Sequence, residues 1–164
     1  MRTKIVAGAE IDTLTREEFH DEMRAFGQEF VAGYLRPPEW REIPGGVDLD
    51  SSGNAAAFEL YTVETGYEFV LTRLEIQPDG YTQESPYNPS TQGGLDIYRD
   101  GRWRDGVPFG GTTGFTLPVV YSQTVGRAIR ALDGAQLTLK VTGGPASTGL
   151  NVLTCGFLTP LPPT

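Results

Sequence analysis

Hydrophobic and polar residues alternate along much of the chain with the two-residue period of β-strands. The clearest case is residues 136–142, where Leu137, Leu139 and Val141 alternate with polar neighbours. Residues 58–77 form a longer apolar stretch, rich in β-branched and aromatic side chains, with one turn signal at Gly66. This stretch predicts two strands folded back on each other and buried at the centre of the fold.

Short turns separate the other strands. Asp100 and Gly101 form the strongest hairpin signal, and Asp105 with Gly106 predicts a second turn soon after it. The pattern amounts to about eight strands without intervening helices. It therefore predicts a mainly β fold, an antiparallel β-sandwich of the jelly-roll type. The 21 glycines and 12 prolines agree with short strands joined by turns.

The N-terminal part follows a different period. Apolar side chains at Phe19, Met23, Phe26 and Phe30 have the spacing of one helix face, and Thr15 begins a capping box. This predicts one amphipathic helix, preceded by an irregular arm and ended by the prolines that follow. Its apolar seam either packs on the β domain of the same chain, or it meets identical helices or a groove on another protein.

These patterns divide the chain into three parts. Residues 1–36 are the arm and helix, residues 37–56 a hinge rich in Pro, Gly and Asp, and residues 57–164 the β-sandwich domain. The prolines and glycines of the hinge argue against regular structure. Trp40 lies in this hinge, where it either packs against the nearest core or anchors a neighbouring subunit.

Charge and composition narrow the range of partners. A formal net charge of −8 argues against nucleic acid, because binding phosphates requires clustered Lys and Arg. No apolar stretch approaches the roughly 20 residues of a membrane span, and the N-terminus lacks the pattern of a signal peptide. We therefore expect a chain that is made in a cytoplasm and contacts neither membrane nor nucleic acid. The single cysteine, Cys155, lies in an apolar strand and is expected to be a buried, inert thiol.

The sequence contains no catalytic signature. His20 is the only histidine and lies among acidic residues of the predicted helix, so neither a Ser-His-Asp triad nor an ordinary zinc site is indicated. The G-x-S-x-G motif of hydrolases is also absent. We expect a protein that is not an enzyme and has no cofactor, with calcium as the one alternative.

The calcium alternative comes from the start of the sandwich region. Asp48, Asp50, Ser52 and Glu59 match the pattern of an EF-hand loop, with Gly53 at the turn. An EF-hand loop lies between two helices, however, whereas Pro and Gly precede this segment and a strand follows it. The other interpretation is an acidic, solvated turn.

A second candidate surface consists of aromatic residues. Residues 81–94 form a long polar loop, which either binds a ligand or is a passive excursion. Tyr81 and Tyr87 from this loop, with Tyr98 and Trp103 from the following strands, are the candidates for contacting a glycan.

Three segments of the chain resemble a known group of proteins. Residues 54–77 (NAAAFELYTVETGYEFVLTRLEIQ), residues 95–98 with the Asp-Gly turn after them, and residues 133–142 (DGAQLTLKVT) carry the resemblance. They are similar to small β-sandwich proteins of tailed bacteriophage particles, such as head decoration and head-spike proteins.

This resemblance implies a non-enzymatic structural protein of a virion. It would be made in the host cytoplasm and would form a homo-oligomer, usually a trimer, that contacts major capsid or tail proteins. The N-terminal helix would then serve docking or oligomerisation, through Phe19, Met23, Phe26, Phe30 and Trp40. The alternative functions are a carbohydrate-binding, lectin-like module, with or without calcium, and a receptor-binding component of a tail or baseplate.

Overall fold

The computed structural model describes residues 2–6, 9–13, 21 and 38–162. The chain divides into two compact units, one of residues 1–37 with 162–164 and one of residues 38–161. In the first unit, β1 (Arg2–Val6) and β2 (Ala9–Thr13) form an antiparallel pair. An irregular arm was predicted here. Each strand has five residues, which is too short for alternation to stand out from chance.

The predicted helix lies almost entirely outside the described residues. Asp21 is helical. The seam residues Phe19, Met23, Phe26 and Phe30, and His20, fall outside the described ranges.

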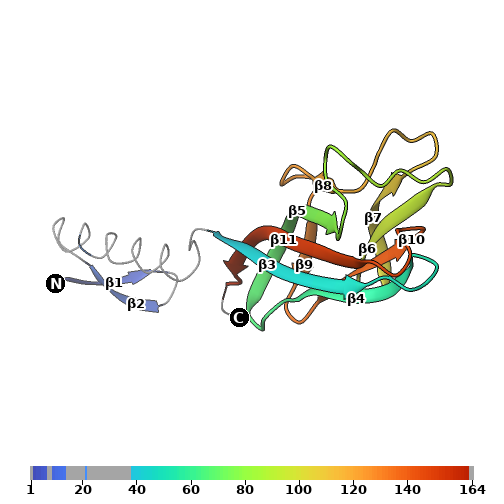
Figure 1. Ribbon diagram of the computed structural model, residues 1–164. Helices are drawn as coiled ribbons and strands as arrows, with labels where there is room; N and C mark the ends of the chain where they lie inside the picture. The colour runs from blue at the N-terminus through green and yellow to red at the C-terminus, as the bar shows by residue number, and fades with distance from the viewer. Residues whose placement is uncertain (1, 7–8, 14–20, 22–37, 163–164) are drawn as a thin grey trace. The chain divides into compact units, whose positions relative to one another are not determined.

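The second unit is a β-sandwich of two antiparallel sheets, which confirms the predicted fold class (Figure 1). The four-stranded sheet has the order β4 (Ala55–Thr62), β10 (Gln136–Thr142), β6 (Gly93–Arg99), β7 (Arg102–Phe109). The five-stranded sheet has the order β3 (Glu39–Asp48), β11 (Gly149–Pro160), β5 (Tyr67–Pro78), β8 (Val119–Ser122), and β9 (Ile129–Leu132) also pairs with β5.

The strand pairs are nested along the chain. β3 pairs with β11, β4 with β10, β5 with β8 and β9, and β6 with β7. This nesting places successive strand pairs in alternate sheets, as in a jelly roll. Figure 1 shows the outermost pair, with β3 in cyan lying beside β11 in red.

The core lies between the sheets and follows from strand alternation. Leu95, Ile97, Leu137 and Leu139 of the four-stranded sheet are fully buried. They pack in one cluster with residues of the five-stranded sheet and of the loops around it. The largest members from that side are Phe69, Leu71, Leu74, Ile76, Leu117 and Leu150.

Residues 58–77 form a crossover between the sheets, so the predicted central hairpin was wrong. β4 pairs with β10, whereas β5 pairs with β11, β8 and β9. Gly66 does take a positive φ of 85°, but the loop bonds mainly to the turn before β10: Val63 N donates to Ala135 O, and Gly66 N to Asp133 Oδ1. A hairpin and a crossover need the same turn residues, so the turn signal cannot distinguish them.

The proposed hinge at residues 37–56 also differs from the structure. Residues 39–48 form strand β3, which pairs with β11 along its whole length. β3 is an edge strand, so no ladder hydrogen bonds form on its open side. Pro44, which lacks a backbone N–H, therefore disrupts none there.

Candidate functional site

An apolar row crosses the outward face of the five-stranded sheet. Trp40 of β3 lies opposite Phe157 of β11, which lies opposite Val70 of β5. The Trp40 and Phe157 rings pack edge to face with 5.0 Å between centroids, and 44% of Trp40 remains exposed. Because side chains alternate along a strand, the neighbours Phe69 and Leu158 point into the core and are buried.

A groove of about 280 Å³ lies along this row. Val125, from the loop between β8 and β9, is 52% exposed at its edge. The other lining residues are Pro38, Glu68, Val70, Arg130, Phe157 and Thr159. The groove therefore combines an apolar floor with a cation and an anion at its side. We call the apolar row and this groove the Trp40 face.

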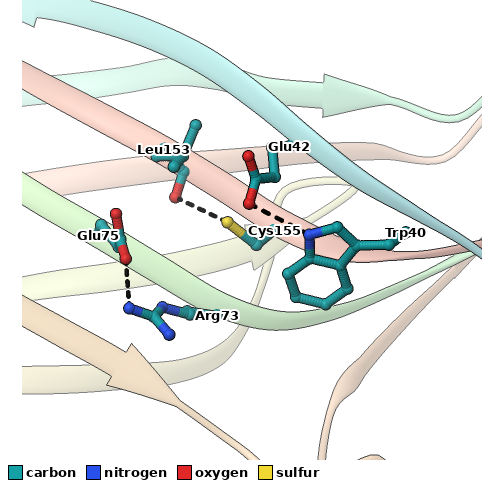
Figure 2. A network of polar contacts seen from close by, with 6 residues as sticks. All are labelled: Trp40, Glu42, Arg73, Glu75, Leu153 and Cys155. Carbon is teal, nitrogen blue, oxygen red and sulfur yellow. Dashed lines mark hydrogen bonds and ion pairs between the residues drawn. The ribbon is translucent and has the colours of Figure 1, made fainter.

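Charged side chains surround the Trp40 face in pairs of opposite sign. Arg130 Nη1 lies 3.1 Å from Glu68 Oε1, whereas the Arg41–Glu39 pair alternates with Trp40 along β3 and lies on the other side of the strand. Arg73 pairs with Glu75 on β5, and Trp40 Nε1 donates to Glu42 Oε1 at 3.2 Å (Figure 2). Two arginines stand beside three glutamates here, so this region is close to neutral although the chain carries −8.

Cys155 lies on the same face of the sheet, between Glu42 of β3 and Arg73 of β5 in the strand register (Figure 2). It is only 2% exposed. Burial raises the pKa of the Cys155 thiol; the nearby Glu42 and Glu75 carboxylates raise it further, and Arg73 opposes them. These surroundings keep the thiol protonated, which is unsuited to nucleophilic chemistry.

A second surface lies on the outward face of the four-stranded sheet. Trp103 of β7 is 57% exposed, and its Nε1 donates a hydrogen bond of 2.9 Å to Asp96 Oδ1 of β6. Both side chains line a shallow hollow of about 280 Å³, together with Gln92, Gly94, Gly106 and Pro108. We call it the Trp103 hollow.

The turn predicted at Asp105 and Gly106 was wrong, because both residues lie within β7. Gly106 is the register partner of Asp96. A Cβ atom at Gly106 would come within 2.7 Å of Asp96 Oδ1. The glycine makes room for the carboxylate, and such a requirement is invisible until the two strands are paired.

The four aromatic residues proposed for glycan contact form two pairs. Tyr81 and Tyr87 pack edge to face with 5.3 Å between centroids, and Tyr87 is partly buried near Phe109. Tyr98 and Trp103 are register partners on β6 and β7. Of the four, Trp103 lines the hollow and the three tyrosines do not.

The residues of the calcium pattern are spread over a turn and a strand. Asp50 Oδ1 accepts hydrogen bonds from Ser52 N at 2.8 Å and Asn54 N at 2.9 Å. Glu59 lies in β4, where it accepts from Thr62 and Gln136. Within the described ranges, no three His, Cys, Asp or Glu residues, Asp48 included, gather in a group that could hold a metal ion.

Phe157, Val70, Asp96 and Gly106 were absent from the candidates drawn from the sequence. Each acquires its role from the register between strands that are distant in sequence or offset by a bulge. The available signal was the alternation of residues 150–158, which assigns Phe157 to the face opposite Leu158.

No helix in the described part of the chain has the length and apolar character needed to cross a membrane.

Comparisons with known proteins do not assign the chain to a family. No protein-family model matches the sequence, and a comparison with curated proteins finds no match. Among solved structures, there is a similarity to a β-glucosidase from Paenibacillus barengoltzii, with a TM-score of 0.32 and 18% sequence identity. It covers 69% of this chain and 10% of that chain, and at this level the similarity carries no argument about function.

Proposed function

We propose that this protein is a non-enzymatic structural protein that forms a homo-oligomer through the Trp40 face, as a component of a phage particle. The observation that carries the proposal is the apolar row of exposed Trp40 and partly buried Phe157 beside a groove, on an otherwise acidic chain. Exposed aromatic residues that border an apolar groove are typical of the centres of protein interfaces.

The local charge of the Trp40 face is compatible with a second copy of the chain as the partner. Two copies that each carry −8 repel one another, so they can meet only where the local charge is balanced. The Arg130–Glu68 and Arg73–Glu75 pairs near Trp40 provide that balance, and each can exchange partners with its counterpart on another copy. A stable interface needs about 800 Å² per partner. The surface that lines the groove has a much smaller area than this, so the neighbouring strands must take part.

The particle setting is supported by the resemblance of residues 54–77 and 133–142 to phage β-sandwich proteins. The jelly-roll fold is also common among viral capsid proteins, which is an argument by analogy. In this setting the oligomer is a trimer on the head or in a spike, and major capsid or tail proteins are its other partners. The helical seam with Phe19, Met23, Phe26 and Phe30 would dock it.

Light scattering coupled to size exclusion tests the oligomer on the full chain. The wild type should be a homo-oligomer, and the double variant Trp40→Ala/Val125→Asp should be a folded monomer. Trp103→Ala is the matched control, because it removes an exposed tryptophan from the other sheet and should leave the oligomer intact. A monomeric wild type at about 100 µM, well above the Kd of a stable assembly, would refute the proposal, as would an oligomeric double variant.

The particle setting needs a separate measurement. The phage particles whose genome encodes this chain are purified from a lysed culture. Mass spectrometry of these particles should detect the chain in a fixed ratio to the major capsid protein. Absence of the chain from the particles would leave an oligomer without a virion role.

A further inference from the structure

We propose that the Trp103 hollow binds one ring of a neutral saccharide. This site is independent of the Trp40 face, because it lies on the outward face of the other sheet. The proposal rests on the orientation of the indole, on two glycines that keep the hollow open, and on the charges around Asp96.

The Trp103 side chain is held in place but not covered. Its Nε1 donates to Asp96 Oδ1 at 2.9 Å, which fixes the indole relative to β6. More than half of the residue, 57%, is nevertheless exposed. An indole that is already ordered loses little conformational entropy when an apolar surface stacks on it.

Two glycines keep the space next to the carboxylate free. Gly106 lies opposite Asp96, where a Cβ atom would meet Oδ1 at 2.7 Å. On the other side, a Cβ atom at Gly94 would meet Asp96 Oδ2 at 3.7 Å and nothing else within 4 Å. A side chain at either position would project towards the carboxylate and fill part of the hollow.

The chemistry of the hollow requires a ligand that donates hydrogen bonds and has an apolar face. Asp96 Oδ2 receives no hydrogen bond from the described residues, and an ionised carboxylate can only accept. A pyranose ring matches both groups, since its C–H face stacks on an indole while its hydroxyls donate to a carboxylate. Gln92 adds an amide at the rim. The volume of about 280 Å³ is just below the range of about 300–1,000 Å³ for pockets of drug-sized ligands, as expected for one ring.

The charge near Asp96 favours a neutral ligand over a cation. Lys140 of β10 is the register partner of Asp96 on the side away from Trp103. Within the described part of the chain, Lys140 forms no ion pair within 4 Å, so its charge partly offsets the carboxylate at longer range. An ammonium ligand would gain less from Asp96 than it would from an isolated carboxylate.

NMR on the full chain can test the site directly, because the chain has only two tryptophans and hence two indole N–H signals. A Trp40→Phe variant assigns them. The probes are methyl glycosides of glucose, galactose, mannose and N-acetylglucosamine, with tetramethylammonium as the cationic arm. At least one glycoside should shift the Trp103 signal alone, with a Kd on the order of millimolar for so small a site.

Three variants identify the groups involved. Gly94→Ala should weaken binding at least about tenfold by filling the hollow, while the stability stays as in wild type, since the added methyl meets nothing closer than 3.7 Å. Asp96→Asn can still accept the Trp103 hydrogen bond but should bind severalfold more weakly. Gly126→Ala is the matched control, because a Cβ atom there meets nothing within 4 Å.

Three results would overturn the proposal. The first is that no glycoside shifts the Trp103 indole signal at concentrations up to about 50 mM, which is well above a millimolar Kd. The second is that wild type and Gly94→Ala bind the glycoside equally well. The third is that tetramethylammonium shifts the Trp103 signal and the glycosides do not. The last result would identify a cation site. Because the oligomer is tested through Trp40, either proposal can fail without the other.

Discussion

The Tyr121 hydroxyl donates a hydrogen bond of 2.6 Å to Asp105 Oδ2 and thereby joins the two sheets of the sandwich. Tyr121 is in β8 of the five-stranded sheet, and Asp105 is in β7 of the four-stranded sheet. Gln123 Nε2 lies 3.3 Å from the same carboxylate oxygen. The sheets are therefore connected by a partly buried polar contact as well as by apolar packing.

We expect Tyr121→Phe to lower the free energy of unfolding by about 1.5–3 kcal/mol, the cost of losing a hydrogen bond to a charged group. Tyr98→Phe is the control, because the Tyr98 hydroxyl makes no hydrogen bond to the residues described in the structure. It should change stability by less than about 0.5 kcal/mol. Urea unfolding followed by circular dichroism measures both, and equal effects would contradict the role of the contact.

The protein should lose stability in alkaline solution. Burial raises the pKa of Tyr61, Tyr87 and Tyr121; hydrogen bonds to Glu64 and Asp105 raise those of Tyr61 and Tyr121 further. A folded-state pKa above the unfolded one contributes stability that is complete below about pH 10 and is lost as the pH rises towards the folded value. Unfolding free energies between pH 8 and 11 should show this fall, and it should be shallower in Tyr121→Phe. If the unfolding free energy of Tyr121→Phe fell with pH as steeply as that of wild type, a raised pKa of Tyr121 would not be the cause of the fall.

Gly156→Ala should destabilise the sandwich strongly, by about 2 kcal/mol or more. A Cβ atom at Gly156 would lie 2.2 Å from the Val70 carbonyl oxygen and 2.7 Å from Phe69 Cζ, so the pairing of β11 with β5 would have to shift. Gly126→Ala is the matched change at an open site. Thermal unfolding compares them, and similar melting temperatures for the two variants would refute the close packing.

The Cys155 thiol should react slowly with a disulfide reagent in the folded protein. It is buried, and burial together with Glu42 and Glu75 raises its pKa, so little thiolate forms at pH 8. We expect the reaction to be on the order of a hundredfold slower in buffer than in urea. Equal rates in the two solutions would show that the strand opens readily at this position.

Calcium should leave the melting temperature of the wild type unchanged, because the Asp50 carboxylate already accepts two backbone hydrogen bonds within its own turn. Asp50→Ala should cost about 1 kcal/mol by removing these bonds, whereas Asp50→Asn keeps an acceptor and should be nearly neutral. Calorimetry with calcium or with a chelator separates the two interpretations. A calcium-dependent increase that is lost in Asp50→Asn would establish a metal site.

The sequence predicted those features of the fold that depend on neighbouring residues. Alternation at Leu137, Leu139 and Val141 placed a strand correctly, and the Asp100–Gly101 turn is present with positive φ at both residues. Strand pairing depends on distant residues instead. The turn at Gly66 was recognised, but nothing within residues 58–77 shows that β4 and β5 belong to different sheets.

The candidate surfaces were predictable only in part. Trp40 and Trp103 stand out in the sequence as large aromatics in polar surroundings, and both are exposed. Their partners were missed, because Phe157 reaches Trp40 through the β3–β11 register and Asp96 reaches Trp103 across a bulged pair. The strand at residues 39–48 was missed because Pro44, Gly45 and Gly46 are typical of turns, and Pro44 is tolerated here only because the strand is at the edge of its sheet.

The pairing of β3 with β11 determines when the fold can be completed during synthesis. β3 leaves the ribosome long before β11, its only strand partner in the described part of the chain. One edge of β5 also remains unpaired until β11 is made. The β6–β7 hairpin, by contrast, can close as soon as it emerges, since its strands are adjacent. Assembly from this innermost hairpin outwards leaves apolar strand edges open until the last strand is made. A ribosome that stalls before β11 therefore releases a chain prone to aggregation.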